Sequence, residues 1–464
     1  MTLVIHDAAV VTVDGDGDAD DRVIYGGAVA IERDRIVAVG PSADVLARHP
    51  GAERIDGAGK AVMPGFANVH THLGLTIARG IYEDLSPPHK PPFTGGLAPL
   101  PLPDLDEAER SVMCQLGALE AIRCGTTAVL EDSTEIESYA DALAASGLRL
   151  LLTERAWDRA RGSIGDPSAF TVDRKLGERC ISRIEALHSR RHGSAGGRVT
   201  VGVSAWAPDM CSPELLRDLS ALQRKLDAVA TIHLNQIWGE VAAVQAARGR
   251  LPTEYLDDVG FLNDRLVAAH CRCMTPQEEA LLGRARVSVA FNSAIAARRG
   301  LSPRIADLES HGCNIAMGTD NMAEDMVEVI RTGLFMERIR RSDGRRPTPE
   351  QALRWATVNG YRAMGFADGG ALVPGNKADL IVIDLRRAHY VPVMRVVSDF
   401  VHQGQGRDVE SVMVDGEWLM RDGVVLTMDE PRLVAEAERI GRTGWKRLFD
   451  SRPDLTPPPG FAHL

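Results

Sequence analysis

Two histidines lie two residues apart in the segment Val69–His70–Thr71–His72, a spacing that could hold a metal ion. In a β-strand, residues i and i+2 point to the same face, so both imidazoles can reach one ion. A His-x-His pair alone is weak evidence, because most such pairs bind no metal. Here, however, His233 and His270 each end a further apolar run, and Asp320 follows another. The chain thus carries metal-ligand residue types at the ends of four separate runs.

Imidazoles combined with a carboxylate suit zinc, cobalt or iron, and the residue types do not choose among these metals. Such an ion lowers the pKa of bound water toward neutrality and thereby supplies hydroxide as a nucleophile. The chemistry that these residues predict is hydrolysis that depends on one divalent metal ion, not redox catalysis.

Eight apolar runs alternate with longer helical patterns from about residue 64 to residue 369. The alternation predicts βα units, and eight of them fit a closed (β/α)8 TIM barrel of the α/β class over residues 61–369. Such a barrel places its chemistry at the C-terminal ends of the strands, where the histidines and Asp320 fall. Amphipathic patterns predict helices over 106–123 and 348–364. The apolar runs are 69–73, 127–130, 148–153, 199–204, 230–234, 266–269, 287–290 and 315–317.

Short alternating strands flank the barrel region at both ends of the chain. They occupy residues 3–5, 9–13, 28–31 and 36–39 near the N-terminus, and 378–383 and 409–416 near the C-terminus. We therefore predict a small composite β-sandwich domain from residues 1–60 and 370–430, followed by a C-terminal helix and tail over 431–464. The Pro- and Gly-rich segment 86–103 is expected to be either a surface loop or a lid over the substrate.

The composition is that of an ordinary globular protein, with 464 residues, 44% of them hydrophobic and 25% charged. A net charge of -11 without a basic run argues against nucleic acid and anionic membranes as partners. No apolar run is long enough to span a bilayer, the N-terminus lacks signal-peptide features, and the seven cysteines are scattered without a disulfide pattern. We expect a cytoplasmic enzyme that acts on a small, neutral organic substrate.

Motifs along almost the whole chain resemble those of the amidohydrolase superfamily, in its branch of cytosine deaminases and triazine hydrolases. The resemblance implies that His70, His72, His233 and Asp320 bind one divalent ion, and that Asp320 shuttles a proton. It implies that His270 binds water or substrate, and makes His270 a further candidate ligand. It also implies a homodimer or a homotetramer. The matching segments are 64–73, 125–127, His233, His270, 318–320, 356–360, 375–380 and 414–416.

Three departures from that pattern bear on the substrate. Deaminases of this branch usually carry a glutamate three residues after the third histidine, where this chain has Gln236. An amide forms hydrogen bonds but does not transfer a proton near neutral pH. Trp206 and Phe291 stand where relatives commonly show histidines. These two aromatic residues are either ordinary core residues or the walls of a hydrophobic pocket for a neutral substrate.

Several other polar residues are candidates for the site. Asn292, Arg79 and His89 could contact the substrate, although for Arg79 a place at the end of a surface loop is the favoured alternative. Asn68 and Thr71 flank the first histidine and are expected to orient the metal ligands.

Three functions fit these observations. The departures resemble the group of molinate and phenylurea hydrolases, so the leading hypothesis is hydrolysis of a carbamoyl C–S or C–N bond in a thiocarbamate or an N-aryl urea. A good leaving group lessens the need for a general acid. The alternative is an aminohydrolase or chlorohydrolase acting on a heteroaromatic ring, with the proton path rebuilt around His270 and Glu240 or Glu324. The third is a catalytically retired member that binds a small ligand.

Overall fold

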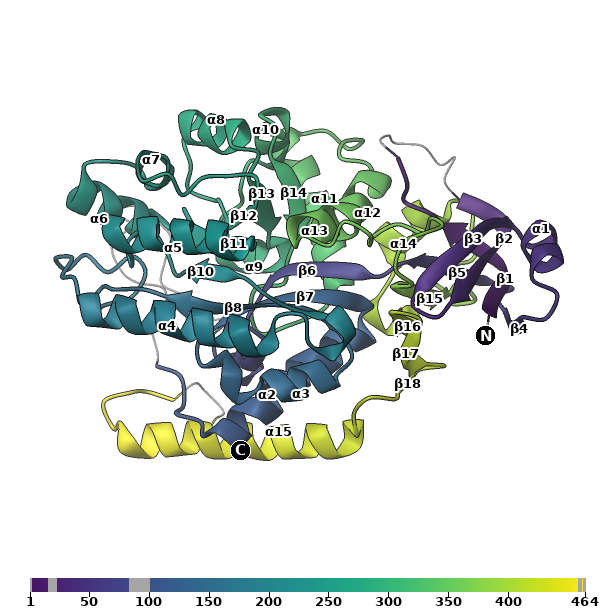
Figure 1. The fold of residues 1–464 in the computed structure, drawn as a ribbon, viewed down its shortest axis with the longest axis horizontal. Coiled ribbons are helices and arrows are strands. Elements are labelled where there is room, and N and C mark those ends of the chain that lie inside the picture. The colour runs from purple at the N-terminus through teal and green to yellow at the C-terminus, as the bar shows by residue number, and fades with distance from the viewer. Residues whose placement is uncertain (1, 16–22, 83–100, 458–460, 462–464) are drawn as a thin grey trace.

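A parallel β-barrel forms the centre of the molecule (Figure 1), in a computed structural model that describes residues 2–15, 23–82, 101–457 and 461. Its strands are β6 (Phe66–Thr71), β7 (Thr126–Ser133), β8 (Arg149–Ala156), β9 (Val199–Val201), β10 (Val203–Ala205), β11 (Ala230–Leu234), β12 (Leu266–His270), β13 (Ser288–Phe291) and β14 (Asn314–Met317). They are ordered β14-β13-β12-β11-β10-β8-β7-β6, with β9 paired to β8, and Thr71 bridges Asp320 to close the ring. The predicted (β/α)8 barrel is therefore confirmed.

Alternating side chains fill the two sides of the barrel wall. One set packs together in the barrel interior and includes Ala67, Val69, Val267 and Ala269. The neighbouring residues in the same strands, such as Phe66 and Ala268, belong instead to the larger core beneath the surrounding helices. This two-residue period is interrupted in β6 between Asn68 and Thr71, where the pairing with β7 shifts register, so His70 need not follow the alternation set by Ala67 and Val69.

Helices surround the barrel (Figure 1), and many begin at the cap that the sequence provides. Asp106 caps α2, and Thr348 caps α12 with a proline in its first turn. The helix predicted over 348–364 is divided at Thr357, whose backbone leaves the helical region. The helices are α2 (Glu107–Arg123), α3 (Ala140–Ala145), α4 (Arg174–Arg191), α5 (Pro213–Leu226), α6 (Trp238–Arg248), α7 (Pro252–Asp258), α8 (Pro276–Arg284), α9 (Ser293–Arg299), α10 (Ile305–Ser310), α11 (Met326–Arg341), α12 (Pro349–Ala356) and α13 (Val358–Ala363), with 3-10 turns η2 (Leu73–Ala78), η3 (Ile136–Ser138) and η4 (Ala195–Gly197).

Strands from both ends of the chain form a second, mixed sheet beside the barrel (Figure 1). They are β1 (Thr2–Val11), β2 (Val23–Glu32), β3 (Arg35–Pro41), β4 (Glu53–Asp56), β5 (Lys60–Pro64), β15 (Leu380–Asp384), β16 (Val409–Val414), β17 (Glu417–Arg421) and β18 (Val424–Val425), with α1 (Ser42–Arg48), α14 (Val396–Gln403) and the 3-10 turn η5 (Gly406–Asp408). β5 pairs antiparallel with β15 and so joins the N-terminal strands to the C-terminal strands. Both chain ends therefore build one β domain, as predicted, and the expected division at residue 60 falls within β5.

A buried ion-pair network connects β8 of the barrel with this second sheet. The guanidinium of Arg149 donates from Nε to Asp379 at 2.8 Å and from Nη2 to Asp415 at 2.6 Å. The hydroxyl of Tyr361 donates to Asp379 at 2.9 Å. The side chains of Arg149 and Asp379 are only 5% and 0% exposed, so neither charge can be solvated if its partner is lost.

We expect the substitution Arg149→Met to lower the free energy of unfolding by about 3 kcal/mol, because it leaves the buried Asp379 carboxylate without its cation. Urea denaturation followed by tryptophan fluorescence measures the change. The matched control is Arg286→Met, which removes an exposed ion pair with Asp264 and should cost less than about 1 kcal/mol. Equal effects of the two substitutions would show that the buried network adds little.

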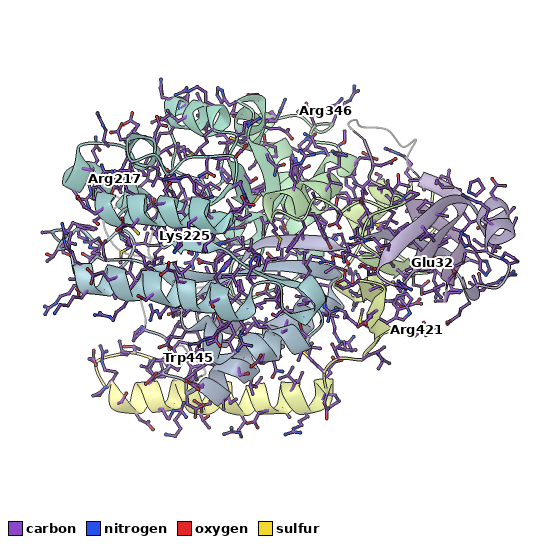
Figure 2. The ribbon with its side chains drawn as sticks, in the orientation of Figure 1. Glu32, Arg217, Lys225, Arg346, Arg421 and Trp445 are labelled. Atoms are coloured by element: carbon purple, nitrogen blue, oxygen red, sulfur yellow. The ribbon has the colours of Figure 1, made fainter. Side chains whose placement is uncertain are left out.

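The long helix α15 (Glu430–Ser451) packs across α2 on the outside of the barrel (Figure 1). Trp445 lies on the side of α15 that faces α2 (Figure 2), and its Nε1 donates to the carbonyl of Ile77 at 2.6 Å. None of the helices in the described part of the chain is both long and apolar enough to cross a membrane.

Candidate metal centre

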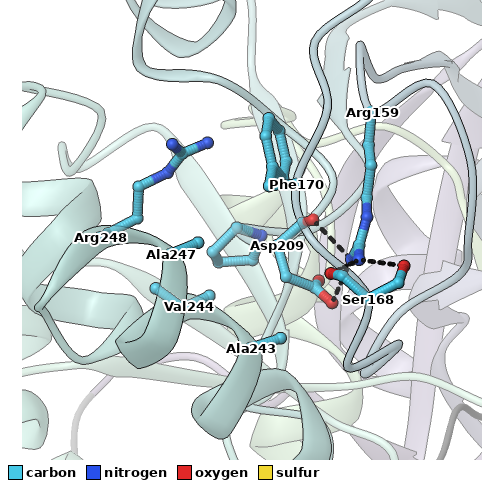
Figure 3. Close-up of a pocket in the computed structure, with 9 residues that line it drawn as sticks. Arg159, Ser168, Phe170, Asp209, Ala243, Val244, Ala247 and Arg248 are labelled. Atoms are coloured by element: carbon cyan, nitrogen blue, oxygen red, sulfur yellow. Dashed lines mark hydrogen bonds and ion pairs between the residues drawn. The ribbon is translucent and has the colours of Figure 1, made fainter.

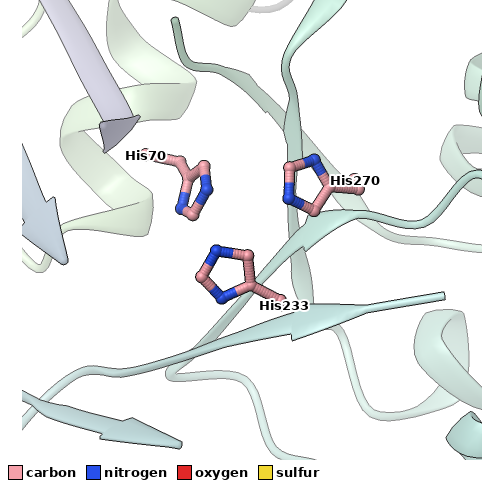
Figure 4. A group of neighbouring side chains, drawn as sticks. All are labelled: His70, His233 and His270. Atoms are coloured by element: carbon pink, nitrogen blue, oxygen red, sulfur yellow. The ribbon is translucent and has the colours of Figure 1, made fainter. Parts of the chain in front are cut away.

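Four histidines meet at the C-terminal end of the barrel. The ring centroid of His70 lies 4.8 Å from that of His72, 4.8 Å from that of His233 and 5.1 Å from that of His270. Figure 4 shows three of these rings facing a shared centre. The carboxylate of Asp320 lies 3.7 Å from Nε2 of His72. The structure therefore brings together all five residues that the strand-end argument selected.

The backbone takes unusual conformations at two of these residues. His270 and Asp320 have φ angles of 78° and 73°, in the left-handed region that non-glycine residues seldom adopt. In β12, Val267 and Ala269 face the barrel interior, so strict alternation would turn His270 outward. The left-handed turn instead brings its ring toward His70 and His233 (Figure 4). Such strain is common where a site fixes a side chain for function.

Hydrogen bonds orient two of the imidazoles toward one another. Nδ1 of His72 donates to the carbonyl of Asp132 at 2.5 Å, and Nδ1 of His233 donates to the carbonyl of Trp206 at 2.9 Å. In a neutral imidazole the other nitrogen, Nε2, then carries a lone pair. These two Nε2 atoms lie only 3.3 Å apart. Two facing lone pairs repel unless a cation lies between them, so this geometry fits a metal ion.

His70 supports the same conclusion. Neither of its ring nitrogens has a hydrogen-bond partner among the described residues, although the side chain is fully buried. Burial, followed by the neighbouring histidines His233 and His72, holds the pKa of His70 well below its ordinary value. Burial also lowers the pKa of His233 strongly. The rings are therefore neutral near pH 7 and offer lone pairs to a metal ion.

Asp132, at the end of β7, is a buried carboxylate beside the histidines that the sequence analysis missed. It accepts hydrogen bonds from Ser204 at 2.6 Å and from Arg155 at 2.9 Å, and its Oδ2 lies 3.7 Å from Nδ1 of His233. Burial raises its pKa, but Arg155 and the histidines outweigh this effect and the pKa is lowered. Its position two residues after an apolar run was a signal that could have been used.

His270 has a different environment from the other histidines. Its Nδ1 lies 3.1 Å from Nη2 of Arg272 and 3.1 Å from Nδ2 of Asn292. Oδ2 of Asp320 lies 3.8 Å from the same nitrogen and 3.9 Å from Arg272. Burial lowers the pKa of Arg272 to about 10, so Arg272 remains a cation near neutral pH. Arg272 was not among the site residues predicted from the sequence.

Gln236 lies in the buried loop that follows β11. Its backbone N–H donates to Glu240 at 2.7 Å, and the neighbouring N–H of Asn235 donates to the same carboxyl at 2.8 Å. Oε1 of Gln236 has no hydrogen-bond partner among the described residues. The carboxyl group of Glu240 therefore holds the backbone of this loop through two hydrogen bonds. Burial raises the pKa of Glu240 well above its ordinary value.

Glu324 supports the other side of the site. Its carboxyl accepts hydrogen bonds from Thr71 at 2.9 Å, from Asn68 at 3.1 Å and from Thr319 at 2.7 Å. Asn68 also accepts from the backbone of Thr319, next to Asp320. Asn68 and Thr71 thus tie the first histidine strand to the segment that carries Asp320, which agrees with their expected orienting role.

The remaining candidates for substrate contact are dispersed. Trp206 is partly buried, stacks edge-on against Trp157 and lies next to the site through its carbonyl, which His233 contacts. Phe291 is fully buried against Trp355, as a core residue. Arg79 pairs with Glu120 and the carbonyl of Met322, and lines a groove beside α15. His89 and most of the predicted lid lie outside the described residues.

A second, small pocket lies beside the loops that follow β8 and β10 (Figure 3). Arg159 donates to the carbonyl of Asp209 at 3.3 Å and to that of Ser168 at 2.7 Å. Burial raises the pKa of Asp209 to about 7. The free space of about 10 Å³ holds roughly one water molecule. This space is too small for an organic substrate.

Taken together, the barrel and the cluster of imidazoles and carboxylates at its C-terminal end define a metal-dependent barrel hydrolase. The chain belongs to the amidohydrolase family, whose sequence profile matches residues 61–419. A profile described as an imidazolonepropionase-like composite domain of bacteria also matches residues 27–52.

Relatives and structural neighbours agree with this membership. The 5′-deoxyadenosine deaminase of Methanothermobacter thermautotrophicus is 33% identical over 422 residues, 89% of this chain and 93% of that protein. The 5-methylthioadenosine/S-adenosylhomocysteine deaminase of Pelotomaculum thermopropionicum is 31% identical over 446 residues, 94% of this chain and 97% of that protein.

Two solved structures are also similar. An adenosine deaminase from Xanthomonas campestris with bound zinc has a TM-score of 0.83 and 26% identity, covering 96% of this chain and 98% of that chain. An atrazine chlorohydrolase from Arthrobacter aurescens with zinc has a TM-score of 0.80 and 20% identity, covering 95% of this chain and 100% of that chain, and supports the fold alone.

Proposed function

We propose that this protein is a hydrolytic deaminase of adenine nucleosides that replaces the ring amino group with oxygen and releases ammonia. The observation that carries the proposal is the full-length similarity, at 33% and 31% identity, to deaminases of 5′-deoxyadenosine and 5-methylthioadenosine. This similarity favours the ring reaction, which was the alternative from the sequence, over cleavage of a carbamoyl bond.

The residues at the centre can be assigned roles in such a reaction. In the proposal, His70, His72, His233 and Asp320 hold one divalent ion, which supplies hydroxide when it is bound. Asp320, which lies between His72 and His270, takes the proton from the attacking water and passes it to the leaving amino group. The amide of Gln236 donates a hydrogen bond to the ring but does not titrate.

An apolar cluster next to the site supports a nucleoside with an apolar 5′ end. Trp206 and Trp157 pack on the buried side chains of Ile164, Met210 and Ile237. A deoxygenated or alkylthio group loses no hydrogen bond when it enters such surroundings, whereas a free hydroxyl would. We therefore propose 5′-deoxyadenosine and 5′-methylthioadenosine as better substrates than adenosine.

Hydrolysis of a carbamoyl bond remains a second candidate function because of Gln236. Gln236 occupies the position where ring deaminases of this branch usually carry a glutamate, and hydrolysis of a thiocarbamate or aryl urea needs no strong acid there.

One experiment separates the two functions. The zinc-loaded protein is incubated with 5′-deoxyadenosine, 5′-methylthioadenosine, adenosine, a thiocarbamate and a phenylurea, and the products are identified by mass spectrometry. A gain of one mass unit on the nucleosides, with ammonia, supports deamination. Release of a thiol or an aniline, with the nucleosides unchanged, would overturn the proposal in favour of carbamoyl hydrolysis.

The substitution Gln236→Glu is expected to raise kcat/KM for deamination by at least about 10-fold, because a carboxyl at this position can transfer a proton to the ring. Steady-state assays by ammonia release measure the change, with Gln236→Met as the matched variant that removes both the amide and the acid. If Gln236→Glu and Gln236→Met lower kcat/KM equally, the amide of Gln236 itself is required and the general acid is another residue.

A further inference from the structure

The arrangement around Nδ1 of His270 fixes which ring nitrogen carries the proton. A guanidinium has N–H donors and no acceptor, so Arg272 can only donate to this nitrogen, at 3.1 Å. Asn292 approaches the same atom with its amide nitrogen, also at 3.1 Å. A nitrogen that accepts hydrogen bonds holds a lone pair and no proton. In the neutral ring, the proton of His270 therefore lies on Nε2.

Nε2 of His270 points into the centre without a partner. This atom is buried and has no hydrogen-bond partner among the described residues. Its ring faces His70 and His233 (Figure 4). His233 has the opposite arrangement, because its Nδ1 donates to a carbonyl and its Nε2 carries a lone pair. Nδ1 of His72 lies 2.5 Å from the carbonyl of Asp132, which can only accept, and 3.3 Å from Nη2 of Arg155, so the shorter contact places the proton of His72 on Nδ1. The rings of two candidate ligands, His70 and His233, therefore lie 5.1 Å and 5.4 Å from a ring that presents an N–H.

We propose that Arg272 is a positioning residue that holds His270 in the Nε2–H form, which is the form that His270 needs for the role in binding water or substrate that the family resemblance implies. This inference bears on the residue that was a further candidate ligand. It rests on the proposed function only for the identity of the group that accepts the hydrogen bond from Nε2, which would be the attacking oxygen or the substrate.

The backbone around Arg272 is built to keep this side chain in place. The N–H of Arg272 and that of Cys273 both donate to the carbonyl of Asn235, at 3.0 Å and 2.9 Å. The amide of Asn235 in turn donates to the carbonyl of Cys273 at 2.8 Å. The guanidinium is almost completely buried, with 2% of the side chain exposed. A rigid, buried donor is a better device for selecting a tautomer than a mobile surface arginine.

A purely structural role for Arg272 gives different expectations. If Arg272 served only as a counter-ion for Asp320, at 3.9 Å, any cation would suffice and the tautomer of His270 would not respond to it. The variants Arg272→Lys, Arg272→Gln and Arg272→Met separate charge from donation. Lysine keeps both, glutamine keeps a donor without charge, and methionine keeps neither.

The first measurement is the tautomer of His270 by ¹⁵N NMR of histidine-labelled protein, with and without zinc, with the signal assigned by comparison with His270→Gln. We expect an unprotonated Nδ1 in the wild type, Arg272→Lys and Arg272→Gln, and a protonated or mixed Nδ1 in Arg272→Met. Loading with ¹¹³Cd tests ligation directly, because nitrogen–cadmium couplings should appear for three histidines and not for His270. A coupling to His270, or a protonated Nδ1 in the wild type, would overturn the proposal.

The kinetic measurement follows on the same variants. Arg272→Met should lower kcat by about 10- to 100-fold with little change in KM, and Arg272→Gln should recover most of the loss. An unchanged tautomer and kcat in Arg272→Met would overturn the proposal. If Arg272→Met does not fold, Asn292→Ala removes the other donor and should weaken the preference for Nε2–H in the same direction. Because the NMR readouts need no substrate, they stand even if nucleoside deamination fails.

Discussion

Replacement of His70 by alanine is expected to abolish metal binding and to lower kcat/KM by at least about 1000-fold, because metal activation of water lowers the activation free energy by several kcal/mol. His70 is the central ring of the cluster, within 5.1 Å of three other imidazoles between ring centroids. Both of its nitrogens lack a partner among the described residues. The measurements are metal content by plasma mass spectrometry and the rate of ammonia release.

The matched control for this variant is His311→Ala, because His311 is exposed at the end of α10. It should keep full metal content and activity. A His70→Ala protein that still binds one ion and turns over at the wild-type rate would contradict the assignment of His70 as a ligand.

The substitution Asp320→Asn should lower kcat by about 10³-fold, with a smaller effect on KM, because an amide cannot accept the proton of the attacking water. The carboxylate of Asp320 lies 3.7 Å from Nε2 of His72 and 3.8 Å from Nδ1 of His270, between two histidines of the centre. Steady-state kinetics on a nucleoside measures the effect, and the metal content is determined in the same preparation.

Asp264→Asn provides the control for Asp320→Asn, since Asp264 is 55% exposed and pairs only with Arg286 among the ion pairs of the described residues. It should leave kcat unchanged. If Asp320→Asn keeps kcat within about two-fold while metal content is retained, the proton does not pass through Asp320 and another base must be sought.

The barrel could be predicted because its strands are short apolar runs separated by clear helical patterns. All eight runs became barrel strands, and the residues at their ends came together because parallel strands in a closed barrel end on one face. The division of the helix at Thr357 could not be predicted, because it depends on a backbone angle that the sequence pattern does not encode.

The site was predictable only in part. The histidines and Asp320 were found by residue type and position, but the positive φ angles that turn His270 and Asp320 toward the centre come from tertiary structure. Arg272 was missed because its significance lies in a contact with His270, not in a spacing motif. Phe291 was left open between pocket and core, and its contact with Trp355 places it in the core.

The substrate was the hardest feature to predict from the sequence. Gln236 suggested the loss of an acid and hence a carbamoyl substrate with a good leaving group. The two reported relatives that match almost the whole chain are deaminases, which instead favours a ring reaction. The residue type at position 236 could not show which other side chains lie close enough to transfer a proton, because the distances between side chains depend on the fold.

The most direct test of a metal-dependent nucleoside deaminase is a zinc titration of the chelator-treated protein, with ammonia release from 5′-methylthioadenosine and bound zinc measured at each point. We predict that activity rises in proportion to bound zinc and saturates at one ion per chain. Zinc bound at this ratio without ammonia release, or equal ammonia release without any metal, would contradict the account.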